Sequence, residues 1–105
     1  MTMRESQIEK YLVDRVKAID GLCWKFVSPG VSGVPDRIIL IEGKTYFVEV
    51  KAESGKLDKI QYHRCRQIRD CGISVDIVKS KEQVDALIER ILNEIRGSRL
   101  SSPDL

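Results

Sequence analysis

The sequence predicts a single α/β domain in which the elements follow in the order helix, three strands, helix, strand, helix. Two patterns carry this prediction. Apolar residues recur at helical spacing in three segments, and β-branched and aromatic residues gather in four short runs between them. A chain of 105 residues, 42% hydrophobic and 32% charged, has the size of one compact domain with a modest core. One active site is therefore the most that we expect.

The chain opens with an amphipathic helix and a short strand. Residues 3–19 carry apolar side chains at helical spacing, with Thr2 as the expected N-cap and Gly21 just past the end. An apolar and aromatic run over 22–27 predicts a strand, which leads into a loop rich in glycine and proline that reaches Pro35.

A β-hairpin is expected next. Residues 36–41 and 45–51 are rich in β-branched and aromatic side chains, so we predict that they pair antiparallel. A type II′ turn prefers glycine at its first central position, which places Gly43 and Lys44 at the centre of the turn. This register puts Asp36 opposite Lys51.

The second half of the chain reads as helix, strand and helix. The pattern predicts a helix over 57–71, a buried strand over 73–78, and a helix that starts at a capping-box sequence, Ser80 to Gln83, and continues to residue 96. Residues 97–105 are small and polar with one proline, so we expect a domain over 1–96 followed by a loose tail.

Composition excludes several classes of protein. No secretory signal and no apolar stretch of membrane-spanning length is present, so a soluble cytoplasmic protein without a membrane partner is expected. The three cysteines form no CxxC pair and, with the single histidine, match no common zinc pattern. We interpret them as reduced, small core residues: Cys23, Cys65 and Cys71.

The net charge of +2 does not by itself indicate a nucleic-acid partner, but the middle of the chain, from Lys44 to Arg69, is locally basic. A solvated helix face is the common alternative for such a run. Five side chains in or near this region are candidates for contacts with the DNA backbone: Lys56, Lys59, Arg64, Ser28 and Ser32.

The hairpin carries the candidate catalytic residues. Side chains alternate between the faces of a strand, so Asp36, Glu49 and Lys51 should share one face. Two neighbouring carboxylates repel unless a cation lies between them, and oxygen ligands favour Mg²⁺, with Mn²⁺ able to substitute. A nearby lysine can orient water and offset developing charge, which is the chemistry of phosphodiester hydrolysis. Each residue alone could be an ordinary turn or surface residue, but a charged trio within apolar strands is costly without a function.

Three segments together resemble the VRR-NUC (virus-type replication-repair nuclease) family of the PD-(D/E)XK superfamily: Gly33-Val-Pro-Asp36, Val48-Glu-Val-Lys51, and Gly55-Lys-Leu57 with Gln61. The resemblance covers roughly residues 3 to 80. It implies a restriction-endonuclease-like αβββαβ core with a mixed central sheet flanked by helices, plus the C-terminal helix.

The resemblance also implies roles for individual residues. Asp36 and Glu49 would bind the metal together with the backbone carbonyl of Val50, Lys51 would be the catalytic lysine, and Gln61 would support the site. Stand-alone members of this size are typically phage proteins that act in the host cytoplasm and are similar to Holliday junction resolvases in cutting branched DNA as homodimers.

Two further site residues have a structural alternative. Gln61 falls on the apolar stripe of its helix and should point inward, unless it forms a capping box with Asp58. Helical phasing places Glu5 closer than Glu9 to the centre of the buried stripe, so Glu5 is expected to join the metal site, directly or through a water. The alternative is that Glu5 forms a capping box with Thr2.

The residues predict a phosphodiester hydrolase that depends on Mg²⁺ or Mn²⁺, and the resemblance implies that it is a deoxyribonuclease acting on branched or structured DNA. A DNA-binding module without turnover is the first alternative, although the intact trio argues against it. The second alternative, a restriction-type nuclease, would need recognition elements for which this chain has little room.

Overall fold

The computed structural model describes residues 3–101 and confirms the expected order of elements. Four strands and three helices follow one another along the chain: α1 (Glu5–Ala18), β1 (Leu22–Lys25), β2 (Arg37–Ile41), β3 (Lys44–Val50), α2 (Lys59–Asp70), β4 (Ser74–Val78) and α3 (Lys81–Ser101). None of the helices in the described part is long and apolar enough to cross a membrane.

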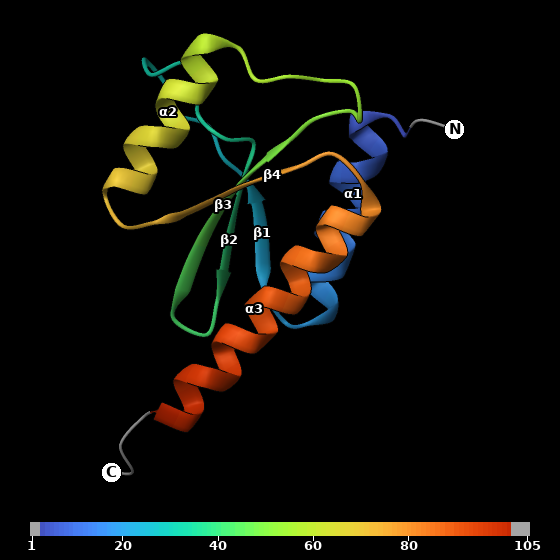
Figure 1. The fold of residues 1–105 in the computed structure, drawn as a ribbon, viewed down its shortest axis with the longest axis vertical. Helices are drawn as coiled ribbons and strands as arrows, with labels where there is room; N and C mark the ends of the chain where they lie inside the picture. The colour runs from blue at the N-terminus through green and yellow to red at the C-terminus, as the bar shows by residue number, and fades with distance from the viewer. Residues whose placement is uncertain (1–2, 102–105) are drawn as a thin grey trace.

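The strands form one mixed sheet in the order β1-β2-β3-β4. The first three strands are antiparallel and β4 runs parallel to β3. Figure 1 shows α1 and α3 together on one side of the strands and α2 on the other. The sheet therefore has a core face, under α1 and α3, and a second face, part of which α2 covers; we call the latter the α2 face.

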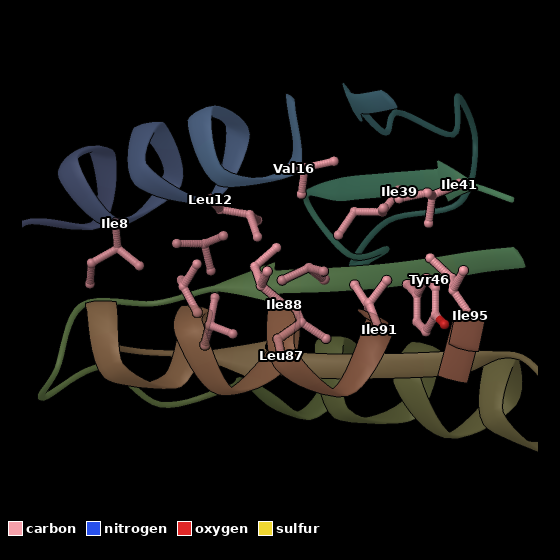
Figure 2. Close-up of a cluster of buried hydrophobic side chains, with 14 residues drawn as sticks. Ile8, Leu12, Val16, Ile39, Ile41, Tyr46, Leu87, Ile88, Ile91 and Ile95 are labelled. Atoms are coloured by element: carbon pink, nitrogen blue, oxygen red, sulfur yellow. The ribbon is translucent and has the colours of Figure 1, made fainter. Parts of the chain in front are cut away.

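The core face holds the hydrophobic core. Ile8, Leu12 and Val16 project from α1 toward side chains of the sheet and of α3, as Figure 2 shows. The spacing of the three residues is i, i+4 and i+8, so one stripe of the helix is removed from water. The remaining members of the cluster come from the strands and from α3: Ile39, Ile41, Tyr46, Val48, Val50, Val78, Val84, Leu87, Ile88, Ile91 and Ile95.

The turn of the hairpin differs from the prediction. Ile41 pairs with Lys44, so Glu42 and Gly43 are the central residues, with φ values of 48° and 74°. Two residues with positive φ make a type I′ turn, whose twist matches that of the flanking strands. The prediction of a type II′ turn was therefore wrong, and the register of the hairpin differs from the predicted register by two residues. Because two is even, every side chain keeps its predicted face.

Several predicted ends of elements also need correction. The cap of α1 is Arg4 and not Thr2, which lies outside the described residues. The helix α3 does not stop at residue 96 but continues to Ser101, so residues 97–101 are no loose tail; residues 102–105 lie outside the described part. An ion pair between Arg99 and Glu42, 2.8 Å long, ties this last turn to the hairpin.

Of the three cysteines, only Cys65 is a core residue as predicted. Cys23 is half-buried, and Cys71 is exposed because it is the C-cap of α2. All three are free thiols, as expected.

Candidate active site

Asp36 and Glu49 lie side by side on the α2 face. Arg37 pairs with Val48, and one further step of the same register places Asp36 opposite Glu49, where we had predicted Lys51. The backbone N–H of Val50 donates to Oδ2 of Asp36 at 2.9 Å, which fixes the orientation of this carboxylate. The N–H of Phe26 donates to the backbone carbonyl of Asp36 at 2.8 Å and anchors the residue from the β1 side.

Glu49 is the one buried charged residue in the described part of the chain. Its side chain is 1% exposed, and neither carboxylate oxygen has a hydrogen-bond partner. Burial, and after it the charge of Asp36, raises the pKa of Glu49 to about 7. An unpartnered carboxyl group in the interior is unfavourable to the fold unless a cation or donors satisfy it.

Lys51 lies on the same face and supplies the neighbouring positive charge. Its Nζ is 3.4 Å from Oε2 of Glu49, and its side chain is largely buried. This distance is longer than that of a charge-assisted hydrogen bond, about 2.7–2.9 Å. The structure thus brings Asp36, Glu49 and Lys51 together as predicted and leaves the Glu49 oxygens without a hydrogen bond, with only a long ion pair to Lys51.

The donors in this place fit a hard divalent ion. Two carboxylates lie side by side, and the buried one has no hydrogen-bond partner. Mg²⁺ binds proteins through one or two carboxylates of this kind and keeps waters in its remaining coordination positions. Among residues 3–101 no group of three or more His, Cys, Asp or Glu side chains forms a metal cage. A third acidic ligand is therefore not placed at the site.

The expectation that Glu5 points inward is wrong. Glu5 is exposed in the first turn of α1, which lies on the core face, whereas the trio lies on the α2 face. Glu9 is the more buried of the two glutamates, and its carboxylate accepts from Nε of Arg37 at 2.7 Å. Glu5 does not form the alternative capping box either, because the cap is Arg4 with Gln7.

Gln61 forms the capping box with Asp58 that we gave as the structural alternative. Its side-chain oxygen accepts from the N–H of Asp58 at 3.1 Å, and its own N–H donates to Oδ1 of Asp58 at 2.9 Å. This capping box starts α2. The cap uses one acceptor position of the amide oxygen and leaves both N–H donors of the Gln61 amide unused.

The candidate DNA contacts fall into two groups. Lys56, Lys59 and Ser32 are exposed, and Ser28 is half-buried. The Nε of Arg64 instead donates to the carbonyl of Ser32 at 2.8 Å, and its Nη1 donates to Gln67. Arg64 therefore ties the loop before Asp36 to α2, a role that sequence reasoning missed because the two residues are 32 positions apart.

Gly33 reinforces this attachment of the loop. Its φ is +80°, and a Cβ built on it would lie 2.9–3.0 Å from side-chain and backbone atoms of Ile60 in α2. Only glycine allows both the positive φ and the close approach. The glycine in the Gly33-Val-Pro-Asp36 segment thus lets the loop pack on α2 three residues before Asp36.

Comparisons with known proteins agree with this geometry. No family model matches the chain. A protein named "Putative nuclease p44", from Acyrthosiphon pisum secondary endosymbiont phage 1, is 41% identical over 81 residues, which cover 76% of this chain and 87% of that protein. A solved structure described as a "VRR_NUC domain" is similar with a TM-score of 0.76 and 39% sequence identity, covering 81% of this chain and 94% of the other. With this likeness in both sequence and fold, the chain belongs to the VRR-NUC family of PD-(D/E)XK nucleases.

Proposed function

We propose that this protein is a DNA endonuclease that requires Mg²⁺, or Mn²⁺ in its place, and hydrolyses phosphodiester bonds in branched DNA. The observation that carries the proposal is Glu49, buried beside Asp36 with no hydrogen-bond partner for either carboxylate oxygen and with only the Lys51 ammonium group, 3.4 Å away, as a positive neighbour. A buried carboxyl group of this kind lowers the free energy of unfolding, and such groups cluster at functional sites. A purely DNA-binding role gives no reason to bury it.

In this proposal Asp36 and Glu49 hold the ion, and the backbone carbonyl of Val50 joins them by the likeness to the family. When bound, the ion would stabilise charge on the scissile phosphate and lower the pKa of the attacking water. The protein contributes a prearranged pair of ligands, since Asp36 is held by the Val50 N–H and Glu49 by its burial in β3.

Lys51 is the proposed catalytic lysine. Its Nζ carries donors beside Glu49, so it can orient the attacking water and donate to a phosphate oxygen as negative charge develops there. Its stem is largely buried, which limits the positions that the ammonium group can take. Prearranged charge of this kind lowers the barrier because little reorganisation is needed during the reaction.

DNA is the proposed substrate, with its backbone contacted by Lys56, Lys59, Ser28 and Ser32. Their exposure at the loop before Asp36 and at the start of α2 supports this placement, since phosphate contacts come from accessible cations, hydroxyls and amides. Arg64 stays in the proposal through the donors that Ser32 and Gln67 do not use. The preference for branched DNA rests on the likeness to the family.

The test is cleavage of labelled single-strand, duplex, flap and four-way-junction DNA in Mg²⁺, Mn²⁺ or EDTA. We expect cleavage of the branched substrates with either ion and none in EDTA. Asp36→Asn, Glu49→Gln and Lys51→Ala should each lower the rate by at least about 100-fold while much of the DNA affinity remains, because phosphate contacts elsewhere supply binding.

Glu53→Gln is the matched control, since Glu53 is an exposed acidic residue two positions after Lys51. We expect its rate to stay at the wild-type level. Undiminished cutting by Glu49→Gln would contradict the proposal.

A further inference from the structure

A cavity of about 220 Å³ lies between α2 and β4 and borders the candidate active site. Leu57, Cys65 and Ile77 line it with apolar surface. Ile77 pairs with Glu49 in the parallel β3–β4 register, so both side chains are on the α2 face. Neighbouring strands are about 5 Å apart. The cavity therefore begins one strand away from Glu49, on the side opposite Asp36.

The rim of the cavity carries an aromatic ring and two guanidinium groups. Tyr62 is 62% exposed although it lines the cavity, so one part of its side chain is available to a ligand. Arg66 is exposed, and its side chain forms no ion pair or hydrogen bond with any residue from 3 to 101. Arg69 is held by the carbonyl of Val75 through Nε and Nη2, at 3.2 and 2.7 Å. Asp70 offsets one of these two positive charges.

This combination suits a nucleobase with its phosphate. Bases that leave the stack are held in proteins by aromatic and apolar side chains, while arginines contact the backbone. The volume is below the about 300–1,000 Å³ of pockets that enclose drug-sized ligands, so it admits one heterocycle and not a duplex. A base that enters must therefore be unpaired.

We propose that this cavity binds one unpaired nucleobase from a nucleotide close to the scissile phosphate. Tyr62 stacks on this base, and the guanidinium group of Arg66 donates to the phosphate of the same nucleotide. The inference rests on the proposed nuclease function and adds a source of substrate choice to it. Bases at a branch point or in a single strand leave the stack at the least cost, so a base-accepting cavity beside Glu49 favours branched DNA over a continuous duplex.

The test removes the base from the DNA and the ring from the protein. Branched DNA is prepared with an abasic residue placed in turn at each position within two nucleotides of the mapped cut, and affinities are measured in EDTA. At one position we expect wild-type protein to bind the abasic DNA about 5- to 100-fold more weakly than intact DNA. Tyr62→Ala should bind both DNAs alike, with an unchanged melting temperature because Tyr62 is exposed. Tyr62→Phe, which keeps the ring, should behave as wild type.

Trp24→Ala is the matched control, since Trp24 is the other strongly exposed aromatic residue in the described chain and does not line the cavity. It should keep the wild-type ratio between the two DNAs. The inference is overturned if no abasic position weakens wild-type binding, or if Tyr62→Ala retains the wild-type ratio. Cleavage that continues in Glu49→Gln would instead overturn the proposed function, so the two failures are distinguishable.

Discussion

At the scale of single residues, the burial of Glu49 in the candidate site lowers the free energy of unfolding of the metal-free protein. Its carboxyl group has been taken out of water and given a second carboxylate as a neighbour, while Lys51 remains 3.4 Å away. Without a metal ion, the folded protein favours the neutral form of the Glu49 carboxyl group more than the unfolded chain does, and this difference is the reason for its raised pKa. An ion bound there would reverse the preference.

The first consequence is a dependence of stability on pH. Because the pKa of Glu49 is about 7 in the folded state and near 4.5 in the unfolded state, only the unfolded state releases the proton between these values. The free energy of unfolding of the metal-free protein should fall across this window, by up to about 3 kcal/mol, and level off above it. Glu49→Gln lacks this decline, so in EDTA it should be more stable than wild type at pH 8 and nearly equal at pH 4.

Urea denaturation of both proteins at several pH values checks this prediction. Addition of Mg²⁺ at pH 8 should stabilise wild type and leave Glu49→Gln nearly unchanged, because a ligand stabilises only the state that binds it. Parallel pH profiles for the two proteins in EDTA would show that Glu49 is not the group responsible.

At the scale of elements, the sequence was a better guide to the face on which each side chain lies than to the residues at which helices and strands end. The trio was placed on one face because strand alternation depends only on whether two residues are an even number apart. The turn type was wrong, since Glu42 adopts a positive φ that its residue type does not favour. Helix α3 extends past Gly97 to Ser101, where Arg99 pairs with Glu42, and no local pattern reveals a contact over 57 residues.

The first helix gives a second case of a distant partner. Helical phasing located Ile8, Leu12 and Val16 correctly, but it carried the same stripe back to Glu5, whose side chain is exposed in the first turn of α1. Glu9 is drawn inward by Arg37, whose guanidinium also donates to the carbonyl of Cys23. This pair links α1 to the start of β2, next to Asp36.

Glu9→Gln should therefore lower the free energy of unfolding by about 1–3 kcal/mol, because it leaves the largely buried Arg37 without its charged partner. Glu5→Gln should change it by less than about 0.5 kcal/mol, as for an exposed surface position. Thermal or chemical denaturation of the two variants compares them directly. A larger decrease in the free energy of unfolding for Glu5→Gln than for Glu9→Gln would show that Glu5, and not Glu9, is the inward-facing glutamate.

At the scale of the whole molecule, the order of elements and the placement of Asp36, Glu49 and Lys51 on one face could be predicted from the sequence, because both depend on local periodicity and on short motifs. The Arg64 to Ser32 bond, the contact of Gly33 with Ile60 and the cavity at Tyr62 could not, because each joins segments that only the folded chain brings together. These long-range features lie between the trio and α2 or the loop before Asp36, which are the segments where we propose DNA contacts.

The last prediction concerns assembly. In the proposed function one trio cuts one strand, whereas a four-way junction is two-fold symmetric, so matched cuts in opposing strands call for two copies related by a C₂ axis. We expect light scattering to give the mass of a homodimer. Mixing wild-type protein with an excess of Glu49→Gln should then produce heterodimers that nick one strand of a four-way junction, while wild type alone cuts both. A monomer that still makes paired cuts, or mixtures that lower the rate without increasing the share of nicked product, would show that the two cuts do not come from one symmetric pair.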